Sequence, residues 1–102
     1  MNRDGCKEEG VGEVIHDAEN RMFTLDTDGF QSRMKYREIS DTELEYYTTF
    51  VPEELRGRGI AQIVVKAALD YARQNGFKVK PTCSFVDKYM QKNKQYADLR
   101  IG

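Results

Sequence analysis

The strongest signal in this chain lies in residues 50–62, which read FVPEELRGRGIAQ. A strand-like segment ends at Pro52, because proline lacks the N–H that a sheet ladder needs. A short loop with two arginines and two glycines follows, and a periodic helix begins at Ile60. Glycine lets backbone N–H groups approach a ligand, a helix start adds partial positive charge, and arginine adds full charge. This order of strand, loop and helix predicts a site for a phosphate group.

Three phosphate motifs compete for this loop. A P-loop needs Gly-Lys-Ser/Thr at the helix start, whereas residues 59–61 read GIA. The dinucleotide fingerprint G-x-G-x-x-G fails at its third glycine, where Gln62 stands, and it belongs in a β-α-β unit near the start of a chain. The pattern R/Q-x-x-G-x-G/A is matched in full by Arg56, Gly59 and Ala61. The third pattern is therefore favoured.

Turn residues and hydrophobic spacing divide the rest of the chain into elements. Strands are expected at residues 11–15, 21–26, 30–37, 44–51 and 77–80, and helices from 60 to a stop at 75–76 and from 84 to about 91, with a last turn at 96–99. The longer helix carries one apolar stripe, made of Ile60, Ile63, Val64, Ala67, Ala68, Tyr71 and Ala72. The shorter helix begins with a capping-box pattern, with Ser84 as N-cap and Asp87 three residues on.

The order of these elements predicts the architecture. The first four strands form a meander with a tight Asp-Gly turn at residues 27–29. The helix after the fourth strand serves as a right-handed crossover, which makes the last two strands parallel. We therefore expect an α+β fold, a mixed and mostly antiparallel sheet with two main helices, as one domain over residues 11–99 behind a flexible leader at 1–10.

Composition limits the function classes. The chain has 102 residues, 39% of them hydrophobic, and a formal net charge of -1, which counts against a nucleic-acid-binding domain. No apolar run approaches the ~20 residues that span a bilayer. The only cysteines are Cys6 and Cys83 and the only histidine is His16, so no structural metal site is expected. A reducing, cytoplasmic location follows most simply from this cysteine content.

The loop and a downstream segment, PTCSFV at residues 81–86, together resemble the GCN5-related N-acetyltransferase superfamily in its small single-domain branch. The resemblance covers about residues 11–99 and implies a minimal acyl-CoA N-acyltransferase-like fold that uses acetyl-CoA as cosubstrate. It assigns the CoA pyrophosphate to Arg56, Gly57, Arg58, Gly59, Ile60 and Ala61, and the pantetheine arm to Phe50 and Val51. A strand splayed from its neighbour leaves N–H and C=O groups with which pantetheine amides can pair.

Cys83 is the candidate catalytic residue, directly before the expected N-cap Ser84. Amides and the dipole at a helix start stabilise a thiolate, which can attack a thioester or act as a base. The resemblance supports such a role, while the alternative is a small buried hydrophobe. Direct transfer needs instead a glutamate or a water as base and a tyrosine as acid. Tyr89 and Tyr96 are candidates for that acid, with packing as their alternative role.

The other aromatic and ionisable residues are expected to be structural. Tyr46, Tyr47, Phe50 and Phe30 alternate on sheet faces, which favours packing over base stacking. His16 is expected to be a polar surface residue.

The larger members of the superfamily carry helices between their first two strands that roof the acceptor site. Here only the turn at residues 17–20 separates those strands. The acceptor side is therefore expected to be open or completed by a partner chain, such as a second copy. This favours a macromolecular acceptor, a dimer or a low-activity enzyme. The sequence thus predicts an acetyl-CoA-binding acyltransferase of unknown amine acceptor, with a non-catalytic CoA-binding or protein-interaction module as the alternative.

Overall fold

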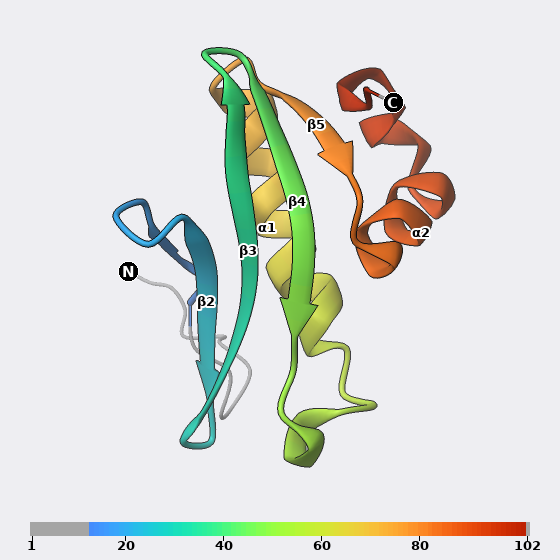
Figure 1. Ribbon diagram of the computed structural model, residues 1–102. Helices are drawn as coiled ribbons and strands as arrows, with labels where there is room; N and C mark the ends of the chain where they lie inside the picture. Colours follow the sequence, from blue (N-terminus) through green and yellow to red (C-terminus); the bar gives the residue numbers. More distant parts are fainter. Residues whose placement is uncertain (1–12, 102) are drawn as a thin grey trace, which may run out of the picture.

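The computed structural model describes residues 13–101 (Figure 1). The strands are β1 Ile15–Asp17, β2 Met22–Thr27, β3 Phe30–Ser40, β4 Glu43–Phe50 and β5 Lys78–Pro81. The helices are α1 Ile60–Gln74 and α2 Ser84–Lys92, and two 3₁₀ segments are η1 Glu53–Leu55 and η2 Lys94–Leu99. The predicted leader at residues 1–10, Cys6 within it, and the first two residues of the predicted first strand lie outside the described residues.

The five strands form one sheet in the order β1-β2-β3-β4-β5. The first four pair antiparallel, and β4 pairs parallel with β5 through the α1 crossover. The turn between β2 and β3 has positive φ angles at Asp28 (52°) and Gly29 (85°), as the Asp-Gly signal predicts. The predicted α+β fold with a mixed, mostly antiparallel sheet is confirmed.

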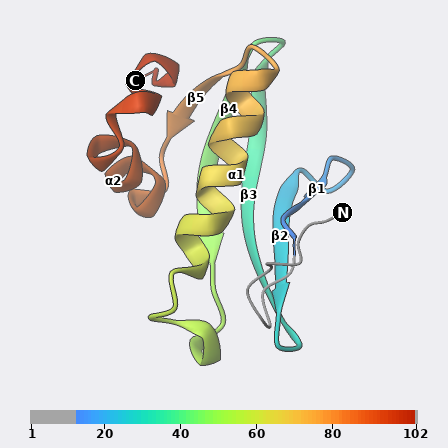
Figure 2. The ribbon, with the colours of Figure 1, turned by 180° about the vertical axis from the view of Figure 1, so that it is seen from behind.

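Helix α1 covers one face of the sheet, as the two opposite views show (Figures 1 and 2). Its buried stripe consists of Ile60, Val64, Val65, Ala68, Leu69 and Ala72. Tyr46 of β4 is fully buried beneath it and donates a hydrogen bond from its hydroxyl to the Ala68 carbonyl at 2.6 Å. Four members of the predicted stripe are buried, whereas Ala67 and Tyr71 are half-buried and Ile63 is 39% exposed. The prediction missed Val65 and Leu69, which face the sheet.

The opposite face of the sheet, hereafter the open face, carries no helix or strand in the part of the chain that the structure describes. A bulge in β4 decides which side chains reach it: Tyr36 pairs with Tyr46, whereas Lys35 pairs with Thr48. Beyond this bulge Thr49 pairs with Met34 and shares the α1 side of the sheet, because directly paired residues point to one face. The next residue, Phe50, lies on the open face.

Three local expectations were wrong. The first strand begins at Ile15 rather than at residue 11, because its register is set by pairing with β2 rather than by its own pattern. Strand β3 runs on to Ser40, where a loop was expected from residue 38. The N-cap of α2 is Cys83, not Ser84, and no side chain bonds the helix start. The Asp87 N–H donates instead to the Cys83 carbonyl at 2.9 Å.

His16 does not lie on the surface as expected. Its ring centroid is 4.5 Å from that of Phe23 and 4.3 Å from that of Tyr71, and its Nε2 lies 2.6 Å from the Tyr36 hydroxyl oxygen. This burial lowers the pKa of His16, and the charge of Asp17 offsets the effect only in part. The expectation was wrong because the strand is centred on His16 rather than ending at it.

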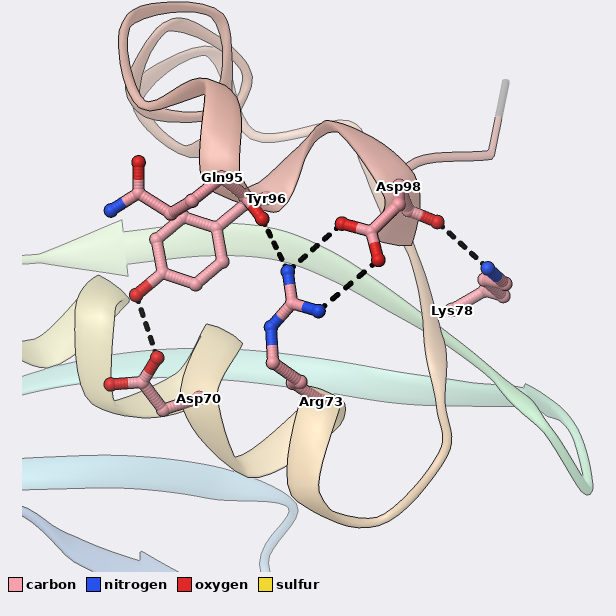
Figure 3. Close-up of polar contacts among 6 residues, drawn as sticks. All are labelled: Asp70, Arg73, Lys78, Gln95, Tyr96 and Asp98. Carbon is pink, nitrogen blue, oxygen red and sulfur yellow. Dashed lines mark hydrogen bonds and ion pairs between the residues drawn. The ribbon is translucent and has the colours of Figure 1, made fainter.

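The C-terminal 3₁₀ segment is tied to the end of α1 by a polar network (Figure 3). Arg73 donates to both carboxylate oxygens of Asp98, at 2.9 and 3.1 Å, and to the Gln95 carbonyl. The buried Tyr96 donates its hydroxyl hydrogen to Asp70 at 2.6 Å. Burial opposes ionisation of Asp70, but the hydrogen bonds from Tyr96 and Lys66 outweigh it and hold the pKa of Asp70 below its ordinary value.

We expect Tyr96→Phe to lower the free energy of unfolding by about 1 kcal/mol at neutral pH, since one hydrogen bond to a carboxylate is lost. Because the pKa of Asp70 is lower in the folded state, this stabilisation is present above the ordinary aspartate pKa and is lost as the pH falls through the folded value. Urea titrations at neutral pH and at about pH 2 test this. Tyr89→Phe is the control, because no hydrogen bond of the Tyr89 hydroxyl is found among the described residues. An equal loss in both variants would contradict the assignment.

Candidate functional site

The loop between β4 and α1 is shaped by one buried anchor and two glycines. The Leu55 side chain is fully buried, and its N–H donates to the Pro52 carbonyl at 2.9 Å. Gly57 and Gly59 follow with φ angles of 83° and 75°, in the left-handed region where side chains are strained. Gly59 is also the N-cap of α1. The glycines therefore let the chain turn sharply from the end of β4 into the helix.

The first turn of α1 presents its backbone amides. The first bond into the helix runs from the Ile63 N–H to the Gly59 carbonyl at 3.3 Å, so the N–H groups of Ile60, Ala61 and Gln62 precede the helical ladder. No acidic residue lies in this first turn. Three amides and the positive end of the helix dipole therefore point out of the helix start, an arrangement that suits an anion.

Two adjoining pockets lie beside the start of α1, and together they are called the groove. A pocket of about 340 Å³ is lined by Val51, Leu55, Arg56, Gly57, Gly59, Ile60, Ala61, Gln62 and Phe85. A second pocket of about 210 Å³ is lined by Thr49, Phe50, Val51, Arg56, Ala61 and Phe85. The groove thus runs from the glycine loop along the end of β4 and past the start of α2.

The structure brings seven of the eight predicted binding residues to the groove: Phe50, Val51, Arg56, Gly57, Gly59, Ile60 and Ala61. Arg56 is held at its rim, because its Nε donates to the Val51 carbonyl at 3.2 Å. Arg58 lines neither pocket and forms an ion pair with Asp28 at 3.0 Å. Sequence reasoning gave no role to Leu55, Thr49 or Phe85. Phe85 lies two residues after Cys83, within residues 81–86. That position was the one signal in the sequence that could have indicated its place in the groove.

One edge of β4 becomes free beside the groove. The last pair between β4 and β5 joins Tyr46 to Pro81, and the Cys83 N–H then donates to the Tyr46 carbonyl at 3.0 Å. Strand β4 continues to Phe50 while the chain turns away into α2 (Figure 1). Beyond Tyr46 no strand of the described residues pairs with this edge. The edge can therefore offer backbone groups to an extended ligand.

Cys83 lies where β4 and the chain after β5 separate. It is half-buried, it carries a free thiol, and its backbone forms the N-cap of α2. Its Sγ lies 3.4 Å from Oγ1 of Thr49, which lines the smaller pocket of the groove. Thr49 therefore connects the candidate cysteine to the groove.

Comparison with known proteins agrees with this geometry. The sequence pattern of the family described as GCN5-related N-acetyl-transferase matches residues 22–99. The chain belongs to this family. Its solved relatives include a GCN5-like protein of Staphylococcus aureus, whose NMR structure matches with a TM-score of 0.69 and 27% identity over 88% of each chain. That match confirms the acetyltransferase fold.

Two animal relatives share more of the sequence. Protein NATD1 of Gallus gallus is 35% identical over 92 residues, which cover 87% of this chain and 84% of that one. Protein NATD1 of Homo sapiens is also 35% identical over 92 residues, covering 87% and 81% of the two chains. The family resemblance stated from the phosphate loop and residues 81–86 is thus confirmed.

The other acid–base candidates for an N-acetyltransferase lie elsewhere. Burial and the bond to Asp70 raise the pKa of Tyr96, and burial raises that of Tyr89. Neither tyrosine lines the groove. Glu45, half-buried on the open face, accepts a hydrogen bond from Thr82 at 2.8 Å and lies 3.4 Å from Arg37. Cys83 is thus the candidate that lies beside the groove.

Among residues 13–101, no three His, Cys, Asp or Glu side chains gather in a way that could hold a metal ion. No described helix combines the length and apolar character needed to cross a membrane.

Proposed function

We propose that this protein is an acetyl-CoA-dependent acyltransferase that acetylates an amine. The observation that carries the proposal is the groove itself, in which a left-handed glycine loop, three outward amides of α1 and Arg56 meet the free edge of β4. Membership of the GCN5-related N-acetyltransferase family supports acetyl-CoA as the ligand. The free thiol of Cys83 fits a reducing compartment such as the cytoplasm.

In this proposal the donor lies along the groove. The amides between Gly57 and Ala61 bind the pyrophosphate, and Arg56 adds a full positive charge at the rim. The pantetheine arm pairs with the backbone of β4 at Phe50 and Val51, as an added strand would. Following the groove along β4 leads to Thr49 and Cys83. The thioester is therefore assigned to that end.

Cys83 then supplies the chemistry. Its thiolate attacks the thioester carbon, the acetyl–sulfur bond to CoA breaks, and CoA leaves as a thiolate that takes up a proton. The acceptor amine attacks the acetyl–Cys83 thioester, a carbon–nitrogen bond forms, the cysteine thiolate is released, and the amine gives up its proton. Thr49 acts as a positioning residue by donating to the cysteine sulfur. In direct transfer, the amine would attack acetyl-CoA itself and no acetyl–Cys83 would form.

A thermal-shift screen with acetyl-CoA, CoA, NAD and ATP tests the donor assignment. A ligand present at 100 times its Kd stabilises the folded state by about 2.7 kcal/mol, which raises the Tm clearly. We expect acetyl-CoA and CoA to raise the Tm while NAD and ATP leave it unchanged. Equal shifts with all four ligands, or none, would contradict the proposal. If the protein binds CoA but releases no free thiol from acetyl-CoA with any amine tested, the non-catalytic module would be favoured.

Substitutions of Arg56 and Arg58 distinguish the contributions of the two positive charges in the loop. We expect Arg56→Gln to weaken CoA binding about 10-fold, because a charge-assisted contact to phosphate and the bond to the Val51 carbonyl are both lost. Arg58→Gln should weaken binding less, since Arg58 is already paired with Asp28. Calorimetric Kd values at low and high salt measure both effects, with Arg21→Gln as a control for net charge. The opposite ranking would contradict the placement of the phosphates at Arg56.

A further inference from the structure

The open face carries a hollow of its own beside the groove. This pocket of about 170 Å³ is lined by Arg33, Lys35, Thr48 and Phe50. Phe50 also lines the smaller pocket of the groove, so both hollows lie at the end of β4. A group bound here would therefore lie next to the proposed path of the donor.

The hollow carries positive charge that no carboxylate of the described residues neutralises. Within residues 13–101 no carboxylate lies at ion-pair distance from Arg33 or Lys35. By contrast, Arg37 on the same strand contacts Glu45 at 3.4 Å. The Arg33 guanidinium carbon lies 4.8 Å from the centroid of the Phe50 ring, which fixes its plane while leaving its donors available. Two cations thus converge on one hollow.

The exposed ring of Phe50 completes the surface. It is 43% exposed, so Phe50 is not among the aromatic residues that pack in the core. No described helix or strand covers this face, and a small molecule bound here would bury little of its surface. An extended chain can contact the hollow and the face around it together. The site is therefore suited to a segment of polypeptide with a negative side chain.

We propose that this hollow selects the acceptor, a peptide whose reactive amine lies next to an acidic side chain. The carboxylate binds Arg33 and Lys35, and the amine then lies toward the groove at Phe50. The transfer forms a bond between the amine nitrogen and the acetyl carbon and breaks the acetyl–sulfur bond, and the amine proton passes to the released thiolate. This inference rests on the proposed acyltransferase function and adds to it the chemical class of the acceptor.

The test compares three labelled peptides that differ only in the residue next to their single free amine, which is Asp, Asn or Lys. Fluorescence anisotropy measures their Kd with and without CoA, and thiol release from acetyl-CoA measures kcat/KM. We expect the Asp peptide to bind about 10-fold more tightly than the Asn peptide, and the Lys peptide to bind most weakly. This preference should shrink as the salt concentration rises.

Variants of Arg33 and Lys35 test whether this hollow causes the preference for the Asp peptide. Arg33→Gln and Lys35→Gln should abolish the advantage of Asp over Asn while the calorimetric Kd for CoA stays unchanged. Arg21→Gln is the control, because it removes an exposed cation outside the hollow that is paired with Glu38. This variant should keep the preference for the Asp peptide. Equal affinity for Asp and Asn peptides, or a preference that survives in both variants, would overturn the inference. So would free aspartate binding as tightly as the Asp peptide. Failure of the protein to bind CoA would instead overturn the proposed function. The two failures can be distinguished, because peptide binding is also measured without CoA.

Discussion

Gly59→Val is expected to weaken CoA binding on the order of 100-fold while the domain still folds. Gly59 has a φ angle of 75°, and a Cβ at this position would lie 3.1 Å from Oε1 of Gln62. The side chain would therefore intrude at the start of α1, where the outward amides would bind the phosphates in the proposed function. Loss of two charge-assisted hydrogen bonds, at about 1.5 kcal/mol each, weakens binding on the order of 100-fold. Isothermal calorimetry with CoA measures the effect.

Gly76→Val is the matched control for this variant. Gly76 has a φ angle of 77°, but a Cβ there would meet no atom within 4 Å, and the residue follows the opposite end of α1. Both substitutions force a β-branched residue into the left-handed region, which costs about 1–3 kcal/mol of stability. Both should therefore lower the Tm, and only Gly59→Val should weaken CoA binding. Unchanged CoA affinity in Gly59→Val would refute the assignment of the loop to the pyrophosphate.

Cys83→Ala is expected to lower turnover by about 100-fold or more, the contribution typical of one positioned catalytic group. Incubation of the unmodified protein with acetyl-CoA should add one acetyl group, located at Cys83 by peptide mass mapping. The Ala variant should show no such adduct and should keep its affinity for CoA. Thr49→Val, which removes the partner 3.4 Å from the sulfur, should slow acetylation of Cys83 while kcat falls more than KM changes.

Ser84→Ala is the control for the cysteine, because the neighbouring exposed serine makes no capping hydrogen bond. It should keep full activity and the acetyl adduct. Full activity of Cys83→Ala, together with no adduct in the unmodified protein, would remove the nucleophile and leave direct transfer. The donor assignment would stand in that case, since it rests on the loop and the β4 edge.

The sequence was sufficient for the elements that a local pattern specifies. The stripe of α1, its end at Asn75-Gly76 and the Asp28-Gly29 hairpin each follow from residues within one turn of one another. The sharp turn between β4 and α1 was also predictable, because its glycines serve a backbone conformation that few other residues adopt.

Features that depend on distant partners could not be predicted in the same way. The register between Ile15 and Thr24 sets the first strand, and no local pattern shows that pairing. His16 is half-buried because Tyr71 of α1 packs on it, a contact between residues far apart in the sequence. The bulge at Tyr47 places Thr49 on the α1 side of the sheet and Phe50 on the open face, the reverse of what alternation counted from Tyr46 predicts. The alternation of side chains along one strand does not reveal a bulge, because the bulge is defined by pairing with the neighbouring strand.

The polar network at the far end of α1 has a practical consequence for measuring these affinities. Arg73, Asp98 and Lys78 hold the last described segment there, and the Ile101 N–H donates to the Val79 carbonyl at 2.9 Å. Helix α1 has 15 residues, so this anchorage lies about 20 Å from the glycine loop. An affinity tag fused beyond Ile101 would thus immobilise the protein on a biosensor chip at the end of α1 that is remote from the glycine loop, which would leave the groove accessible to the solution.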